Sequence, residues 1–317
     1  MGEPLVWVRG IHFAAAIGVA GALLCLALIA EPAFRKIEDD GRISALVRSR
    51  LAWIEWSGLA LVVLSGAAWL VLKAAQMGDV PLQAVFSEGL VPIVLSGTDF
   101  GQDWIARSVL AALLAAALVA ARPALTSYFA GLVAACILSA ALVGTLAWAG
   151  HAAATLDGLG AVHIASDILH LVAAAAWVGA LLPLALLIGP ALACADAPSI
   201  AIAREAVLRF SMLGIVSVGT LLTTGIINTW AIVGSLTALA GTDYGRLLLF
   251  KIAMFLAMLS LAAINRLRLT PVFQRNLNAI GAINALHRIR ANTLLEAAFG
   301  IIIVAVVGLL GTLSPGE

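Results

Sequence analysis

HIASDILHLVAAAAWVGALLPL, residues 163–184, places two histidines and an aspartate at the start of a stretch that is otherwise almost entirely apolar. The hydrocarbon core of a bilayer is about 30 Å thick and an α-helix rises about 1.5 Å per residue, so about 20 apolar residues are enough to cross it. The stretch therefore predicts a transmembrane helix that carries ionisable groups near one of its ends.

The composition of the whole chain is also that of a membrane protein. Of the 317 residues, 63% are hydrophobic and only 11% are charged, which is too apolar for one water-soluble core. The net charge of +1 and the lack of a Lys/Arg run exclude nucleic acid as a partner, because phosphate binding needs concentrated positive charge. The three cysteines form no Cys-x-x-Cys pair and so indicate no disulfide framework, zinc site or thiol redox motif.

Eight apolar runs of this kind follow one another along the chain. The first is interpreted as a true span and not as a signal peptide, because Glu3 precedes it and no small-x-small cleavage site stands before Glu31. We expect an all-α integral membrane protein with eight transmembrane helices, forming a single transmembrane domain over residues 1–317. The predicted spans lie near residues 5–30, 51–75, 104–121, 125–149, 163–189, 211–234, 247–264 and 294–313.

The positions of Lys and Arg predict the orientation. Most of the 18 Lys and Arg residues follow an odd-numbered span, at Arg122 and within residues 35–50, 204–209 and 266–290. Cytoplasmic loops carry the excess of positive charge in membrane proteins. Both termini are therefore expected to face outward.

Four of the five histidines then fall at the outer side. His12 lies about two turns into the first span, His151 follows the fourth span, and His163 and His170 begin the fifth. A helix turns by about 100° per residue, which places His163, Asp167 and His170 on one narrow face. Ionisable groups inside a membrane are costly and usually face a partner, a bundle interior or a water-filled path. This polar stripe, with His12 at a comparable depth, is the principal candidate for a metal site.

Two interpretations of the stripe remain open. Imidazole and carboxylate together suit a borderline divalent ion such as Cu(II) or Zn(II). His163 and His170 are about 10 Å apart along the helix axis, which is too far for both to bind one ion. We therefore expect either two successive metal-binding sites or one site completed by His12 of the first span. Alternatively, Asp167 and His170 form a buried polar pair that only fixes helix packing, with Arg9 or Arg107 completing the charge balance.

A secondary path for an ion has four candidate residues. Met254 and Met258 lie four apart in the seventh span, and thioethers favour Cu(I), although methionine is also an ordinary gap-filler. Asn228 and the nearby Thr224 in the sixth span either line a path or form hydrogen bonds between helices. His151, in the loop after the fourth span, completes the set.

Other polar and aromatic side chains receive structural interpretations. Glu55 and Glu296 lie in the first turns of helices that begin at the cytoplasmic side, where interfacial water makes a charge cheap. Five tryptophans near span ends are typical of an aromatic belt at the membrane surface. They are Trp53, Trp56, Trp69, Trp104 and Trp230.

Four segments of the chain resemble the CopD (PcoD) family of copper resistance membrane proteins. They begin DILHLVAAAAWVGALLPL (from 167), RFSMLGIVSVGTLL (from 209), YGRLLLFKIAMF (from 244) and RIRANTLLEAAF (from 288), so residues 163–315 carry the resemblance. The resemblance implies an eight-span bacterial inner-membrane protein that handles copper, commonly proposed to carry copper ions from periplasm to cytoplasm. It also implies a separate periplasmic copper-binding partner of the CopC type. His170 falls on the Leu-His segment of the family.

No enzyme signature accompanies these features. The chain has no Gly-rich phosphate loop, no Gly-x-Ser-x-Gly elbow and no His-Glu-x-x-His motif, so we do not expect an enzyme. Two alternatives to copper transport remain. One is a membrane haem protein or oxidoreductase in which His12 and His170 are axial ligands, and the other is an accessory protein that binds copper without transporting it.

Overall fold

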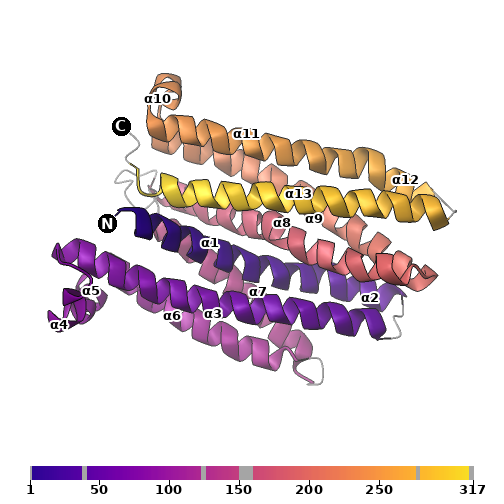
Figure 1. Cartoon of the computed structure of the whole chain (residues 1–317), viewed down its shortest axis with the longest axis horizontal. Coiled ribbons are helices and arrows are strands. Elements are labelled where there is room, and N and C mark those ends of the chain that lie inside the picture. Colours follow the sequence, from indigo (N-terminus) through magenta and orange to yellow (C-terminus); the bar gives the residue numbers. More distant parts are fainter. Residues whose placement is uncertain (1, 38–40, 123–125, 150–159, 276–278, 314–317) are drawn as a thin grey trace.

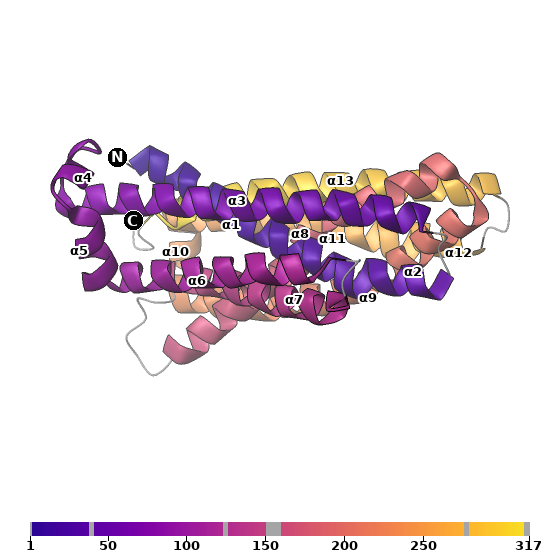
Figure 2. The same ribbon diagram turned by 90° about the horizontal axis from the view of Figure 1, so that it is seen from below.

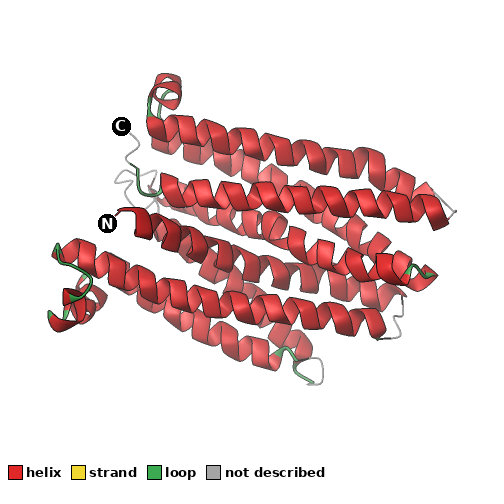
Figure 3. Cartoon of the chain, in the orientation of Figure 1, coloured by secondary structure: helices red, strands yellow, loops and turns green. Residues whose placement is uncertain are grey.

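The computed structural model describes residues 2–37, 41–122, 126–149, 160–275 and 279–313, and in this part the chain forms helices joined by short loops, with no strand (Figure 3). Eight of its helices are long and apolar enough to cross a membrane, as predicted. The first span is α1 (Gly2–Cys25), η1 (Leu26–Ala30) and α2 (Glu31–Ile37). The others are α3 (Arg42–Gly78), α6 (Asp99–Ala120), α7 (Tyr128–Gly144) with η2 (Thr145–Ala149), α8 (Gly160–Cys194), α9 (Ala197–Val233), α11 (Asp243–Ile264) with η4 (Asn265–Leu269) and α12 (Thr270–Arg275), and α13 (Ala279–Leu310).

Both chain termini lie at the same end of the bundle, which we call the terminal end (Figure 1). The short helices α4 (Ala84–Ser87), α5 (Leu90–Gly97) and α10 (Leu236–Gly241) also lie there (Figures 1 and 2). The opposite end, called the basic end, holds α2, η4, α12 and the first turns of α3, α9 and α13. It carries most of the Lys and Arg residues identified in the sequence.

The helices form two groups that meet along α1 and α8. The N-terminal group contains α1, α3, α6 and α7, and the C-terminal group contains α8, α9, α11 and α13 (Figure 1). At their junction α1 and α8 approach so closely that a Cβ atom on Gly179 would lie 2.3 Å from the carbonyl oxygen of Ile17. A Cβ on Gly21 would lie 2.1 Å from the carbonyl carbon of Gly179. Small residues allow this backbone contact, which is how helices commonly pack in membranes.

Several helices are longer than the apolar runs predicted. Helix α9 begins at Ala197, whereas the sixth span was predicted from residue 211. Its extra turns contain charged residues that form ion pairs outside the apolar part, including Glu205 with Lys36 at 2.7 Å and with Arg209 at 2.8 Å. The length of an apolar run shows which residues cross the hydrocarbon core of the bilayer. It does not show where the helix begins or ends, because helical hydrogen bonding can continue into the polar residues on either side.

Three structural interpretations from the sequence need correction. Trp53 and Trp230 are exposed, as an aromatic belt requires, but Trp69 is only 3% exposed and packs in the core against Phe13 and Phe100. The two glutamates assigned to hydrated helix ends, Glu55 and Glu296, are likewise buried between helices. They are 5% and 1% exposed.

Candidate functional site

The polar stripe of α8 faces α9 in the half of the bundle nearer the terminal end. His170 Nδ1 lies 2.9 Å from Thr224 Oγ1, and Asn228 Nδ2 donates to Asp167 Oδ1 at 3.1 Å. The two helices run in opposite directions, so residues three or four apart on α8 meet residues four apart on α9. We call Asp167, His170, Thr224 and Asn228 the α8–α9 site.

The hydrogen bonds of Thr224 determine which nitrogen of His170 carries the proton. The Thr224 hydroxyl has one hydrogen and donates it to the carbonyl oxygen of Thr220 at 2.6 Å. Its contact with His170 must therefore be accepted from Nδ1–H, which leaves a lone pair on Nε2. A neutral imidazole held by Nδ1–H with a free Nε2 is the arrangement that metal-binding histidines usually adopt.

The charge next to the site comes from a residue that the sequence analysis left unassigned. Lys251 of α11 interacts electrostatically with both Asp167 and His170. The cation that acts on Asp167 is thus Lys251, whereas Arg9 or Arg107 was expected. The sequence does contain an indication of this role. Lys251 is a single cation within the apolar run LLLFKIAMF, and a charge inside a membrane needs a partner.

His12 belongs to the N-terminal group and faces α3. Its Nδ1 lies 3.0 Å from Ser65 Oγ, and Ser65 donates its hydrogen to the carbonyl oxygen of Leu61, so Nδ1 of His12 is the donor. The Nε2 atom is buried and has no hydrogen-bond partner among the described residues. The ring packs edge-on against Trp69 at a centroid distance of 5.5 Å. His12 and His170 thus bind side chains of different helices, which offers no support for a haem held between them.

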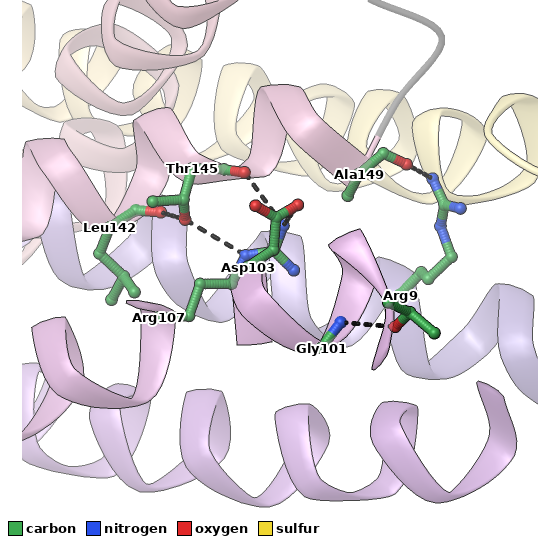
Figure 4. Close-up of polar contacts among 8 residues, drawn as sticks. Arg9, Gly101, Asp103, Arg107, Leu142, Thr145 and Ala149 are labelled. Carbon is green, nitrogen blue, oxygen red and sulfur yellow. Dashed lines mark hydrogen bonds and ion pairs between the residues drawn. The ribbon is translucent and has the colours of Figure 1, made fainter. Parts of the chain in front are cut away.

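Two buried arginines make the surroundings of His12 cationic. The guanidinium carbons of Arg9 and Arg107 lie 5.3 Å and 5.4 Å from the centre of the Trp69 ring. Arg9 donates to the carbonyl oxygen of Ala149 and Arg107 to that of Thr145 (Figure 4). Arg9 also donates to the carbonyl oxygen of Gly311. These carbonyls end helices, and arginine commonly satisfies such groups. The arginines therefore have structural partners, among them Asp103, whose Oδ2 lies 3.8 Å from Arg107. The two arginines still outnumber this one carboxylate, which makes His12 less suited to a cation than His170.

The remaining sequence candidates are distributed as follows. His163 is buried two turns before His170 on α8, and His151 lies outside the described residues. Met258 is fully buried in an apolar cluster with Trp177 and Leu181, where it fills the core. Asn228 and Thr224 do form the hydrogen bonds between helices that were one of their two interpretations. No group of three or more His, Cys, Asp or Glu side chains that could hold a metal occurs in the part of the chain described.

The fold and this site define a multi-span membrane protein with an ionisable, ligand-type cluster between two helices of its C-terminal group. A family model described as "Copper resistance protein D-like, N-terminal domain" matches residues 1–162, and one described as "Copper resistance protein D" matches residues 204–310. The chain belongs to the copper resistance protein D family. The match includes the first 162 residues, whereas the resemblance seen in the sequence was carried by residues 163–315.

Three relatives show how far the similarity extends. The chain is 32% identical to copper resistance protein D of Pseudomonas syringae pv. tomato over 224 residues, covering 70% of this chain and 71% of the relative. It is 28% identical to inner membrane protein YebZ of Escherichia coli over 311 residues, 97% of each protein. It is 35% identical to copper transport protein CutJ of Bacillus subtilis over 183 residues, covering 57% of this chain but only 33% of that protein. No solved structure matches the chain. The protein is thus a multi-pass inner-membrane protein of a copper-handling family.

Proposed function

We propose that this protein carries copper ions from the periplasm to the cytoplasm and binds them first at the α8–α9 site. The observation that carries the proposal is the hydrogen bond from Nδ1–H of His170 to Thr224, which holds Nε2 ready as a ligand. The Lys/Arg-rich basic end is assigned to the cytoplasm by the positive-inside rule, so the site lies in the periplasmic half. A separate periplasmic protein of the CopC type is the copper donor that we expect at the terminal end.

The ligands available at the site suit copper. His170 supplies an imidazole nitrogen, Asp167 supplies the carboxylate oxygen that Asn228 does not bind, and the Asn228 carbonyl oxygen is buried without a partner among the described residues. Nitrogen and oxygen ligands in this combination favour Cu(II) among the first-row divalent ions. His163 lies two turns nearer the terminal end, and we propose that it binds the ion before the ion reaches the α8–α9 site. When no ion is bound, Lys251 balances the charge of Asp167.

The direction of transport is tested by total cell copper. Cells that express the wild-type protein should accumulate more copper than cells that carry the empty vector, measured at equal external copper by elemental analysis of washed cells. Because the proposed site lies in the periplasmic half and binds the ion first, the excess should grow with external copper until the site is saturated. Unchanged copper would refute transport and favour an accessory copper-binding role, and decreased copper would mean export.

Thr224→Val tests the role proposed for the hydroxyl. Valine has nearly the shape of threonine but cannot accept the bond from His170 Nδ1–H, so the ring loses its fixed orientation. Loss of such an outer partner lowers metal affinity by roughly 10–100-fold. Equilibrium copper binding by the purified protein measures this. Thr223→Val is the matched control, because its hydroxyl is exposed and bonds only to Gly219 of its own helix. Equal affinities for Thr224→Val and wild type would contradict the assignment.

A further inference from the structure

Glu296 of α13 is buried in the half of the bundle nearer the basic end, away from the α8–α9 site. One carboxylate oxygen, Oε1, accepts a hydrogen bond from Asn265 Nδ2 at 2.9 Å, and Asn265 in turn accepts from Asn292 Nδ2 at 2.8 Å. The other oxygen, Oε2, is buried and has no hydrogen-bond partner among the described residues. A buried polar atom without a partner is rare in proteins and calls for a ligand or a proton.

The backbone of α11 is modified where it meets Glu296. Asn265 begins the π-helical turn η4, and its carbonyl oxygen accepts from Thr270 Oγ1 at 2.7 Å, five residues on. A π-turn inserts one extra residue per turn, which changes the direction of the side chains that follow, and such turns are frequent at functional sites. Here the turn coincides with the residue that binds the buried carboxyl group.

The charged groups around Glu296 are engaged elsewhere. Arg266, next to Asn265, donates to Ser211 of α9, and Arg290 of α13 donates to the carbonyl oxygen of Ala185. Helix α8 has no titratable residue between His170 and Cys194, and Lys251 of α11 interacts with the distant α8–α9 site. No ion pair of Glu296 occurs within the described ranges, in contrast to Glu31 and Glu205 at the basic end. A carboxylate here would thus be charged, nearly dry and uncompensated, which is strongly unfavourable inside a membrane.

Resting on the proposed copper transport, we propose that Glu296 is a proton-binding site that loses its proton when a copper ion passes. At rest Glu296 is a neutral carboxylic acid with the proton on Oε2. When the ion approaches, the O–H bond breaks, the proton leaves to water at the basic end, and the carboxylate compensates the charge of the ion. After the ion has left, a proton from the same water restores the acid.

Helix α11 and the apolar cluster beside it connect Glu296 with the α8–α9 site. Helix α11 carries Lys251, which interacts with Asp167, and it continues into η4, where Asn265 binds Glu296. The apolar cluster that contains Trp177 of α8 and Met258 of α11 packs against Ala297, the neighbour of Glu296 on α13. One turn beyond Glu296, a Cβ on Gly300 would lie 2.4 Å from Val178 Cγ1 and 3.9 Å from Met258 Cε. Helix α13 is therefore in close contact with α8 and α11 at this level. A cation that crosses this apolar interval has no other carboxyl group of the C-terminal helices to compensate its charge.

Glu55 provides a matched comparison within the same molecule. It is a buried glutamate of α3 at the same end, and its Oε1 also lacks a hydrogen-bond partner among the residues described. It belongs to the N-terminal group and has no part in the proposed path. Glu55→Gln and Glu296→Gln make the same chemical change, and in each case glutamine can keep the shape of the side chain.

The experiment uses infrared difference spectra and copper uptake of the whole protein in lipid vesicles. The wild type should show the carbonyl band of a protonated carboxylic acid that Glu296→Gln lacks and Glu55→Gln retains, and added copper should remove this band. Copper uptake by vesicles containing Glu296→Gln should be roughly tenfold slower than wild type, because a glutamine cannot become charged. Uptake by Glu55→Gln should equal that of wild type.

Different results separate the two proposals. Identical spectra of wild type and Glu296→Gln, or a band that copper does not change, would overturn the proton site. Equal slowing by both variants would also overturn it, since it would reveal a general sensitivity to changes in the core. If wild-type vesicles take up no copper, the proposed transport fails, while the copper-free spectra still decide whether Glu296 carries a proton.

Discussion

Replacing His170 with alanine is expected to abolish the copper accumulation that the wild-type protein produces. His170 is the one imidazole of the α8–α9 site, and its Nε2 is the only nitrogen ligand that the site offers. Loss of an outer partner already costs roughly 10–100-fold in metal affinity, so loss of the ligand itself should lower the affinity by more than about 100-fold. Total cell copper and equilibrium copper binding by the purified variant measure the two consequences.

His287→Ala is the control for this substitution. His287 is an exposed histidine on α13 at the basic end, so its removal changes the histidine count without affecting the site. Both variants should be compared at equal amounts in the membrane. Accumulation by His170→Ala at the wild-type level would refute a role for the α8–α9 site, whereas a loss in both variants would point to a general effect on copper handling.

The sequence was sufficient to predict the number of spans, because each span is an apolar run long enough to cross the bilayer. An even number of spans then places both termini at the same end. Helix ends were predicted less well. Helix α9 starts at Ala197 because the Asp196 side chain caps it by accepting from the backbone N–H of Ser199, and ion pairs such as Lys36 with Glu205 support its turns beyond the apolar part. Such pairs depend on which helices are neighbours, and hydropathy does not contain that information.

The site shows the same division between local and tertiary information. Helical spacing correctly placed Asp167 and His170 on one face, since both bind side chains of α9. The depth of His12 in the membrane suggested that it lies near them. The sequence did not show that its side chain faces α3. Lys251 and Glu296 were visible as charges within apolar runs. Treating Glu296 as hydrated was wrong because a position near a span end does not show which side chains pack around it in the folded bundle.

Gly179→Leu is expected to prevent stable folding of the bundle. Gly179 follows the Ala-rich segment of α8 and contacts the backbone of α1, where even a Cβ atom would lie 2.3 Å from the carbonyl oxygen of Ile17. Overpacking a core typically costs about 1–3 kcal/mol when side chains can adjust. Here the obstacle is backbone, so α1 and α8 must separate, and their contact joins the two helix groups. The yield of monodisperse protein in detergent and its thermal unfolding midpoint measure the effect.

Gly219→Leu separates this contact from a general intolerance of leucine for glycine. Gly219 lies within α9, and a Cβ atom at this position would meet no other atom within 4 Å. Removal of a glycine from the interior of a helix is favourable for the helix itself, by about 0.5–1 kcal/mol for alanine. The Gly219 variant should therefore fold as well as the wild type. If Gly179→Leu also gave monodisperse protein with an unchanged midpoint, the close approach of α1 and α8 would be wrong, and the two helix groups would have to meet along another surface.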